Sequence, residues 1–445
     1  MSSISQQQND LSPLGMERDV SKLNSEHTGI APSEIAVGVI VGRASEYFDY
    51  FVYGIASVLV FPGVFFPFEE PLEGTLYSFV VFALAFIARP IGTIVFFDIQ
   101  RRWGRGVKLT SALFMLGFAT AGIAFLPGYE SIGPWAIVLL SILRFFQGIG
   151  LGGSWDGLPS LLALHAPPKR HGWYAMIPQL GAPIGFIIAA ALFLYLYSQL
   201  TSADFMEWGW RYPFYVAFAI NVVALFARLR IVVTDDYEEL LDKYQLHPVE
   251  KVSELLDTSG GSIVTGAFAA LASYALFHLV TVFPLSWLIV HSAQAIDDIL
   301  IVQILGGGLA LIGVMASGWI ADRIGRRSTL GTMAVLIGIF AALSPLMLGG
   351  QVIHQNIFIL VGFTLLGLSY GQSAGAATGN LEAKYRYTGA ALTSDLAWLI
   401  GAAFAPLVAI GLSSRFGLVA LSGYLLSGVI GTLVALAVNR TLNKD

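Results

Sequence analysis

The chain has 445 residues, of which 56% are hydrophobic and only 12% charged, and its net charge at pH 7 is −5. Soluble domains carry about 25% charged residues, so this composition excludes a soluble globular protein. No basic patch with interleaved aromatic residues exists, so we expect no nucleic-acid partner. The chain has no cysteine, which excludes disulfides, thiolate metal sites and a cysteine nucleophile.

Residues 1–33 are polar and rich in Ser, Gln and Asn. They lack the basic-then-apolar layout of a signal peptide, so we expect a disordered cytoplasmic tail. Beyond this tail, stretches of about 20 apolar residues recur, each long enough to cross the hydrocarbon core of a bilayer. We expect twelve membrane-spanning helices, spans 1 to 12, at residues 34–62, 75–97, 107–127, 134–163, 172–198, 211–231, 263–290, 299–320, 328–349, 355–378, 387–411 and 416–438.

Residues 232–262 are the one long polar connection in the interior of the chain. Apolar residues recur there with helical spacing, which predicts an amphipathic cytoplasmic linker that ends at Ser259-Gly260-Gly261; a plain tether is the simpler interpretation. The linker separates an N-terminal six-helix bundle at 34–231 from a C-terminal one at 263–438, which is followed by a short cytoplasmic tail at 439–445. The expected fold class is an all-α membrane protein.

Lys and Arg outside the spans concentrate in the termini and in the connections that follow spans 2, 4, 6, 8 and 10. The positive-inside rule therefore places these connections and both termini in the cytoplasm. We expect a multi-pass protein of the inner or plasma membrane, surrounded by lipid.

A short basic turn occurs twice, as Arg102-Trp103-Gly104-Arg105 and as Asp322-Arg323-Ile324-Gly325-Arg326-Arg327. Arg102 and Arg323 are 221 residues apart, about half the chain, and each copy connects two apolar spans. A duplicated loop at the same place in two hydrophobic halves predicts a membrane transporter with a two-fold internal repeat.

Four charged residues, Glu46, Asp49, Arg89 and Arg144, fall deep inside spans of the first half. A charge at the bilayer centre costs roughly 2.5–3.5 kcal/mol, and such residues usually line a pathway. Glu46 and Asp49 share a helix face, and carboxyls that close disfavour double ionisation. We expect these two to carry a proton, and Arg144 and Arg89 to meet an anionic substrate. A buried ion-pair network that only fixes helix packing is the alternative.

The second half is poorer in charge. His278 in span 7 and Asp395 in span 11 are substrate-binding candidates, although His278 also fits a satisfied interior histidine. Glycines on span 4, Gly148 and Gly152, and Gly367 on span 10 predict close approach of helices. Walker loops, zinc-binding helices and nucleophile elbows are absent, so we expect no enzyme, no metal and no cofactor.

Several longer motifs accompany these residues, namely Glu46-Tyr47-Phe48-Asp49-Tyr50-Phe51-Val52-Tyr53-Gly54, Arg89-Pro90-Ile91-Gly92, Arg144-Phe145-Phe146-Gln147-Gly148, Trp208-Gly209-Trp210-Arg211-Tyr212-Pro213-Phe214, Gly318 with the second basic turn, and Glu382 with Arg386-Tyr387-Thr388-Gly389. Together they resemble the major facilitator superfamily, in its metabolite:proton symporter branch, over nearly all of residues 34–438.

The resemblance implies secondary active transport by alternating access, driven by a proton gradient. It implies substrates that are small organic acids, such as oxoglutarate, citrate or shikimate, or zwitterionic osmolytes, such as proline and betaine. It adds Tyr53 and Gln147 to the substrate-binding candidates. It makes the loop motifs cytoplasmic gates, formed by Arg102, Gly104, Arg105, Gly318, Asp322, Arg323, Gly325, Arg326, Glu382 and Arg386.

The chain also departs from the family pattern. Gln100 and Arg101 stand where the first basic turn usually carries Gly and Asp, so the first gate lacks its usual carboxylate. Ser154 stands where the span-4 motif usually has Glu, and Asp156 follows two residues later.

We therefore expect a symporter of protons and a small organic acid, a mono-, di- or tricarboxylate, in which Asp49 with Glu46 carries the proton. A carrier of zwitterionic osmolytes, and a membrane sensor that binds without turnover, remain open. The expected partners are the small-molecule substrate, protons and the bilayer, and we expect a monomer.

Overall fold

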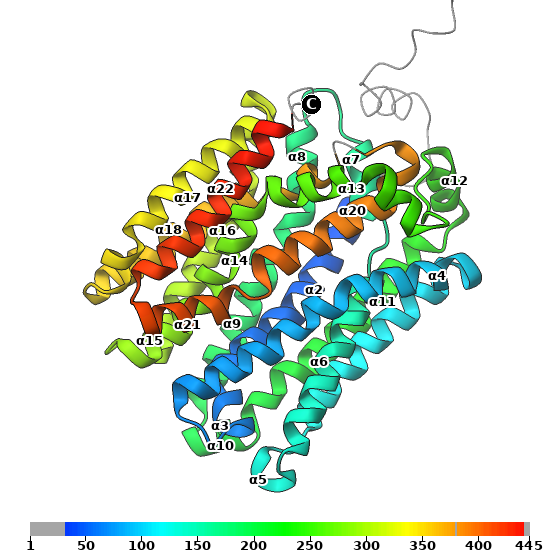
Figure 1. Cartoon of the computed structure of the whole chain (residues 1–445). Helices are drawn as coiled ribbons and strands as arrows, with labels where there is room; N and C mark the ends of the chain where they lie inside the picture. Colours follow the sequence, from blue (N-terminus) through cyan, green and yellow to red (C-terminus); the bar gives the residue numbers. More distant parts are fainter. Residues whose placement is uncertain (1–31, 379–380, 440–445) are drawn as a thin grey trace, which may run out of the picture.

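The structure, a computed structural model, describes residues 32–378 and 381–439, and every regular element in these residues is helical. The expected tails, 1–33 and 439–445, lie outside the described residues except at residues 32, 33 and 439. Figure 1 shows long helices in two groups, one containing α4, α6 and α11 and the other containing α17, α18 and α22.

The N-terminal group holds spans 1 to 6. Several spans are broken into two or three consecutive helices, so the elements outnumber the spans. In chain order they are α2 (Pro32–Leu59), α3 (Phe61–Phe65), α4 (Pro71–Phe125), α5 (Tyr129–Ile132), α6 (Trp135–Gly153), α7 (Leu158–Leu164), α8 (His171–Met176), η1 (Ile177–Leu180), α9 (Gly181–Gln199), α10 (Ser202–Glu207), η2 (Gly209–Arg211) and α11 (Tyr212–Val232).

The C-terminal group holds spans 7 to 12 and follows the helix α12 (Asp235–Lys243). Its elements are α13 (Val252–Ala269), α14 (Leu271–Thr281), α15 (Phe283–His291), α16 (Ile296–Ile324), α17 (Arg326–Leu348), α18 (Val352–Tyr370), α19 (Ser373–Thr378), α20 (Ala383–Ala397), the π-helical turn η3 (Trp398–Ala402), α21 (Ala405–Phe416) and α22 (Val419–Val438).

Twelve membrane-spanning helices follow from these elements. Ten helical segments among the described residues are long and apolar enough to cross a membrane, and α4 counts as one of them. The residue Gly104, at a φ of +85°, divides α4 into two legs and so makes two spans of it. The remaining span is α2, which hydropathy alone misses because Arg43, Glu46 and Asp49 lie at its centre.

The positive φ explains why both basic turns carry a glycine. Gly325, between α16 and α17, has a φ of +84°, close to that of Gly104 between the two legs of α4. Residues with a side chain avoid this region of backbone space, and glycine does not. The repeat seen in the sequence is therefore a repeat of backbone geometry.

The two groups pack as bundles along a shared interface. The helix α16 of the C-terminal bundle lies against α8 and α9 of the N-terminal bundle, and α20 lies against α4. The predicted close approach of glycine-bearing helices is confirmed, because a Cβ built on Gly148 or Gly152 of α6 would overlap backbone carbonyl oxygens of α4. A Cβ built on Gly367 of α18 would likewise overlap the carbonyl oxygen of Ala310 in α16.

The polar connection between the bundles is ordered and docked. Thr234 caps α12 by accepting the N–H of Tyr237 at 3.3 Å, and the Tyr237 side chain is fully buried. The expectation that a linker helix ends at Ser259-Gly260-Gly261 is wrong, because α13 passes through these residues into span 7. Glycine inside a helix costs about 1 kcal/mol relative to Ala, a penalty that a helix anchored at both ends tolerates.

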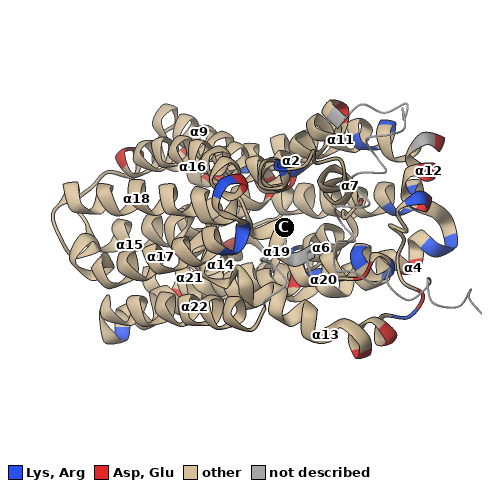
Figure 2. Cartoon of the chain, turned by 90° about the horizontal axis from the view of Figure 1, so that it is seen from above, with Lys and Arg blue, Asp and Glu red and all other residues tan. Residues whose placement is uncertain are grey.

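We call the end of the molecule that holds α7, α8, α12 and the start of α13 the loop end (Figure 1). Viewed from above, the ribbon is mostly uncharged, and Lys, Arg, Asp and Glu gather in short stretches around α4, α12 and α13 (Figure 2). This distribution fits a protein whose flanks face lipid and whose loop end faces water.

Candidate functional site

Asp49 lies on α2 in the interior of the N-terminal bundle, with 2% of its surface exposed. Thr120 Oγ1 and Asn221 Nδ2 donate to its Oδ2 at 2.8 and 2.7 Å, and Gln147 Nε2 donates to its Oδ1 at 3.3 Å. Among the described residues no ion pair to Asp49 is present. The carboxyl is therefore held by three neutral donors, from α4, α11 and α6.

Arg144, expected to meet the substrate, is enclosed instead. Its Nε donates to the Phe82 carbonyl oxygen at 3.2 Å and its Nη1 to Gln147 Oε1 at 3.1 Å. Its guanidinium lies 3.8 Å from the ring centroid of Tyr53, in a cation–π contact. Since Gln147 also donates to Asp49, it connects the arginine to the carboxyl. The ring of Tyr53 packs over the guanidinium group of Arg144.

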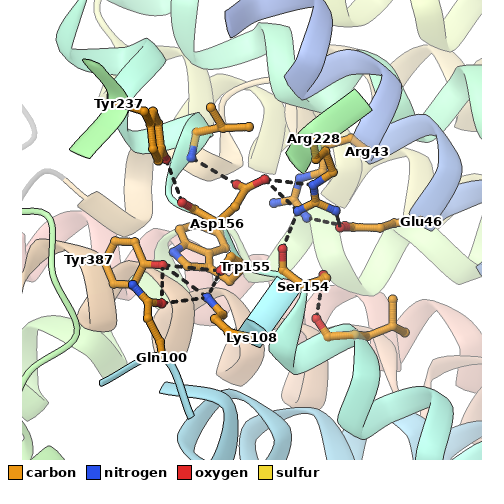
Figure 3. A network of polar contacts seen from close by, with 12 residues as sticks. Arg43, Glu46, Gln100, Lys108, Ser154, Trp155, Asp156, Arg228, Tyr237 and Tyr387 are labelled. Atoms are coloured by element: carbon orange, nitrogen blue, oxygen red, sulfur yellow. Dashed lines mark hydrogen bonds and ion pairs between the residues drawn. The ribbon is translucent and has the colours of Figure 1, made fainter. Parts of the chain in front are cut away.

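Glu46 belongs to a different cluster (Figure 3). Arg43 Nη1 and Arg228 Nη1 lie 3.0 and 2.8 Å from its two carboxyl oxygens, and Arg228 also pairs with Asp156 at 2.8 Å. Arg228 Nη2 donates to the Ser154 carbonyl oxygen as well. The expectation that Glu46 and Asp49 act as adjacent carboxyls is not met, because Glu46 has two cationic partners and Asp49 has none among the described residues.

Arg89 and Asp395 form an ion pair between the two bundles. Arg89 Nε lies 2.7 Å from Asp395 Oδ1, and Thr93 Oγ1 donates to Asp395 Oδ2 at 2.5 Å. We expected both Arg89 and Asp395 to meet the substrate. The structure pairs them across the interface between α4 and α20, so each neutralises the other.

His278 also reaches across the interface. It is fully buried on α14, and its Nε2 forms a hydrogen bond with the Tyr50 hydroxyl of α2. Its ring packs among aromatic rings of both bundles, with the centroids of Phe82 and Phe277 at 5.3 and 5.2 Å. Whether it donates or accepts depends on the tautomer. The site connects the bundles through rings as well as charges.

Three cavities meet at Arg43. The largest, about 760 Å³, lies between the bundles, and the other two, about 410 and 420 Å³, extend toward Glu46 and Arg89. Arg43 lines all three, whereas Arg144, Asp49 and His278 line none of them. The lining of the largest includes Arg43, Tyr47, Trp155, Ser160, His171, Gln179, Tyr274, Arg326, Tyr370 and Trp398.

The second basic turn closes the loop end against α8. Asp322 accepts the backbone N–H groups of Gly172 and Trp173 at 2.7 and 3.2 Å. Gly318 allows this contact, because a Cβ built on it would lie only 2.8 Å from Met176 Cγ. Carboxylates are stabilised at helix N-termini, so Asp322 holds the two bundles together there.

The other residues of the second gate are placed around this contact. Arg323 lies 3.7 Å from the ring centroid of Trp319, and Arg326 Nη1 donates to the Gly375 carbonyl oxygen at 3.4 Å. Glu382 is exposed just before α20, and Arg386 is buried on that helix.

The first basic turn makes different contacts, as its departures from the family pattern predict. Arg102 pairs with Asp98 at 2.8 Å on the surface, and Arg105 pairs with Glu238 of α12 at 3.0 Å. Gln100 accepts at its Oε1 from Lys108 Nζ and from the Tyr387 hydroxyl, both at 3.1 Å (Figure 3).

Lys108 is the centre of this first contact. It is 2% exposed, and its ammonium donates to Gln100, to the Trp155 carbonyl oxygen and to the Tyr387 hydroxyl at 3.2 Å. Tyr387 belongs to α20, so the ammonium bridges the bundles with neutral acceptors where the second turn uses a carboxylate.

Residues 244–254 connect both bundles at the loop end. Arg101 Nη1 donates to the carbonyl oxygens of Val249 and Glu250, the latter at 2.7 Å, while the Val249 N–H donates to Thr388 Oγ1 at 3.0 Å. Lys384 pairs with Glu254 at 2.8 Å, and this contact holds the pKa of the Glu254 carboxyl below its usual value. The pair therefore stays ionised at neutral pH.

Sequence reasoning missed Arg43, Arg228, Lys108, Asn221 and Thr120. Asn221 carried a usable signal, since a lone amide in the apolar run of span 6 needs a partner. Arg43 and Arg228 were visible as charges within spans, but their connection through Glu46 joins helices α2 and α11, whose relative rotation a single sequence does not give.

Known protein families and solved structures share the fold described above. The family model described as Major Facilitator Superfamily matches residues 134–406, and that described as Sugar (and other) transporter matches residues 35–232. Among solved structures, the proton:xylose symporter XylE bound to 6-bromo-6-deoxy-D-glucose superposes with a TM-score of 0.70 at 16% identity, covering 91% of this chain and 94% of that one. At this identity the likeness concerns the fold alone.

Curated relatives are transporters. The inner membrane metabolite transport protein YhjE of Escherichia coli K12 is 35% identical over 95% of this chain and 96% of its own. The shikimate transporter of the same organism is 30% identical over 86% and 88%, and its proline/betaine transporter is 25% identical over 91% and 83%. This chain is therefore a multi-pass membrane transport protein, not an enzyme, and it belongs to the major facilitator superfamily.

Proposed function

We propose that the protein is a secondary active transporter that carries a small organic acid together with a proton by alternating access. One observation carries the proposal. The largest cavity between the bundles is lined by two arginines, Arg43 and Arg326, and by no Asp or Glu. A cavity with guanidinium groups and no carboxylate favours an anion over a cation or a neutral sugar.

Asp49 is the proposed proton carrier. Taking a carboxylate out of water without a cation costs several kcal/mol, and taking up a proton removes this cost. Three neutral donors hold the side chain in place in either state, since Thr120, Asn221 and Gln147 stay hydrogen-bonded to at least one oxygen. Glu46 is assigned a supporting role, because Arg43 and Arg228 already neutralise it.

The two states of the cycle differ at the bundle interface. Closure of the loop end uses Asp322 against Gly172 and the Lys108 contact with Tyr387, and both must break for the cavity to open there. The Tyr50–His278 and Tyr47–Tyr370 hydrogen bonds join the bundles on the other side of Arg43 along α2 and must break for opening at the opposite end. Binding energy between the substrate and both bundles drives the exchange.

A carrier of zwitterionic osmolytes is the second candidate, and one observation favours it. Five aromatic side chains, Tyr47, Trp155, Tyr274, Tyr370 and Trp398, line the same cavity. Aromatic faces bind quaternary ammonium groups by cation–π attraction. This candidate ranks second because a zwitterion also carries a positive group, and the lining offers no carboxylate to pair with it.

The test uses purified protein in proteoliposomes with a pH dye inside. Organic acids and osmolytes are added one at a time, and acidification of the lumen is followed. Lumenal acidification on addition of carboxylates supports the proposal, and acidification on addition of betaine or proline supports the second candidate. Ligand binding without proton movement or flux refutes both and leaves a membrane sensor.

The proposed place is the inner membrane with both termini in the cytoplasm, since YhjE is an inner membrane protein and the basic turns lie at the loop end. We propose a monomer.

A further inference from the structure

We propose that Arg43 is the residue that binds the substrate carboxylate, through its Nε and Nη2 edge. The inference rests on the proposed function, because it assumes an anionic substrate in the cavity between the bundles. It differs from the expectation drawn from the sequence, which gave this role to Arg144 and Arg89.

The donors of Arg43 are mostly unused. A guanidinium has five N–H donors, and among the described residues Arg43 makes one hydrogen bond, from Nη1 to Glu46 Oε2 at 3.0 Å. The edge formed by Nε and Nη2 is the one that a carboxylate contacts in a bidentate pair. The side chain is 18% exposed, and it lines all three central cavities.

Three other arginines of the interior are already engaged. Arg89 is paired with Asp395, and Arg228 is bound by Glu46, Asp156 and the Ser154 carbonyl oxygen. Arg144 has no contact with the cavities, because Tyr53, Phe82 and Gln147 surround it. Arg43 lines the cavities with an edge that a substrate can reach while the ion pair between Nη1 and Glu46 stays in place.

The rest of the local structure holds Arg43 in place. Its guanidinium lies 5.8 Å from the ring centroid of Trp155. A Cβ built on Gly181 of α9 would lie 2.5 Å from Arg43 Cβ, so α9 supports the base of the side chain. Glu46 fixes Nη1 and is itself held by Arg228. A preorganised arginine loses less freedom on binding than a mobile one.

The charges near Arg43 explain why an anion needs a proton. Arg43, Glu46, Arg228 and Asp156 carry two positive and two negative charges, so the cluster is neutral. A carboxylate that joins it adds a net negative charge away from water, and a proton on Asp49 cancels that charge. Arg43 thereby ties recognition of the anion to proton uptake.

The test measures binding to the full chain in detergent with two pairs of probes, benzoate against benzamide and succinate against succinamide. Quenching of tryptophan fluorescence reports occupancy, since Trp155 and Trp398 line the cavity. We expect the wild type to prefer an acid over its amide. Arg43→Gln is expected to weaken acid binding about tenfold or more and to leave amide binding unchanged, because charge-assisted hydrogen bonds contribute most of the difference.

Two further variants keep the test decisive. Arg43→Lys retains a charge for Glu46 but not the bidentate edge, and we expect it to lose acid affinity while remaining folded. Arg230→Gln is the matched control, since Arg230 is exposed in the last turn of α11, and it is expected to bind as the wild type does.

The inference is overturned if Arg43→Gln still prefers an acid over its amide. If Arg43→Gln does not fold, the same result in a folded Arg43→Lys overturns it. Equal losses for acid and amide also overturn it, since they point to a structural role. If the wild type binds no acid, the proposed function fails and this inference with it. If acid binding depends on Arg43 but no proton moves in proteoliposomes, the proposed coupling fails and the inference stands.

Discussion

Replacing Asp49 by Asn is expected to separate folding from proton coupling. The new amide is nearly isosteric with the carboxyl, and its oxygen keeps the two short contacts, from Thr120 at 2.8 Å and Asn221 at 2.7 Å. Its NH₂ group then faces Gln147 Nε2, the most distant donor at 3.3 Å. The change loses one weak hydrogen bond, so the expected cost is about 1 kcal/mol of the free energy of unfolding.

The effect on transport is expected to be much larger. If one proton moves with each substrate, a gradient of about one pH unit is worth about 1.4 kcal/mol and supports about tenfold accumulation. A side chain that does not ionise removes this coupling, so Asp49→Asn is expected to equilibrate substrate without concentrating it. Exchange of labelled for unlabelled substrate needs no net proton movement and is expected to persist.

The assay compares wild type and variant in proteoliposomes, first with an imposed pH gradient and then with equal pH and unlabelled substrate inside. Thermal unfolding in detergent confirms that both proteins are folded. Undiminished gradient-driven accumulation by Asp49→Asn refutes the assignment of Asp49 as the proton carrier. If the folded variant loses both exchange and accumulation, Asp49 is assigned to substrate binding instead.

Three further predictions concern the interface and the helix packing. Gly148→Ala is expected to destabilise the protein by about 1–3 kcal/mol, since its Cβ would overlap the Ala85 carbonyl oxygen; Gly308→Ala, which meets nothing within 4 Å, is the control, and equal thermal stability of the two variants contradicts the packing argument. Breaking the pair at Arg89 or Asp395 singly, to Gln or Asn, is expected to cost about 3–5 kcal/mol in thermal unfolding, and the double variant less than the sum; strict additivity argues against the ion pair. Tyr387→Phe removes the acceptor that α20 offers to Lys108 and is expected to shift the loop end toward opening about fivefold, for a loss of about 1 kcal/mol. A cysteine at Ser160 in the cavity lining reports this opening by its rate of labelling, because the chain has no other cysteine, and an unchanged rate refutes the role of Tyr387.

The fold was accessible from the sequence because the bilayer imposes length and polarity on each span. The apolar runs predicted the spans, the repeated basic turn predicted the two-fold repeat, and the glycines of α6 predicted the close approach of helices that is seen at Gly148. The linker was the exception. Gly260 and Gly261 were interpreted as the end of a helix, but tertiary anchoring of α13 overrides the local preference.

The site was accessible in part. Burial cost singled out Asp49, Glu46, Arg89 and Arg144, and all four lie in the interior. Their pairing was not accessible, because it depends on how α2, α4, α6 and α11 rotate about their axes. Depth along a helix is a matter of counting residues, whereas the direction of a side chain depends on neighbours far away in the sequence. Arg89 shows this, since its partner Asp395 is in the other bundle.

The docked connection between α11 and α13 also bears on how fast the carrier works. About 20 residues lie between Val232 and Val252, and such a chain, if extended, would reach about 65–70 Å. Its length therefore does not limit how far the bundles separate.

Its contacts do, because Glu238 is held by Arg105, and Val249 and Glu254 are held by Thr388 and Lys384. None of these residues lines the three cavities that meet at Arg43. We therefore expect them to change the waiting time before the cavity opens without changing which substrate it selects. We therefore expect the turnover rate and the substrate preference to depend on separate sets of side chains, so that a change in one leaves the other free to vary.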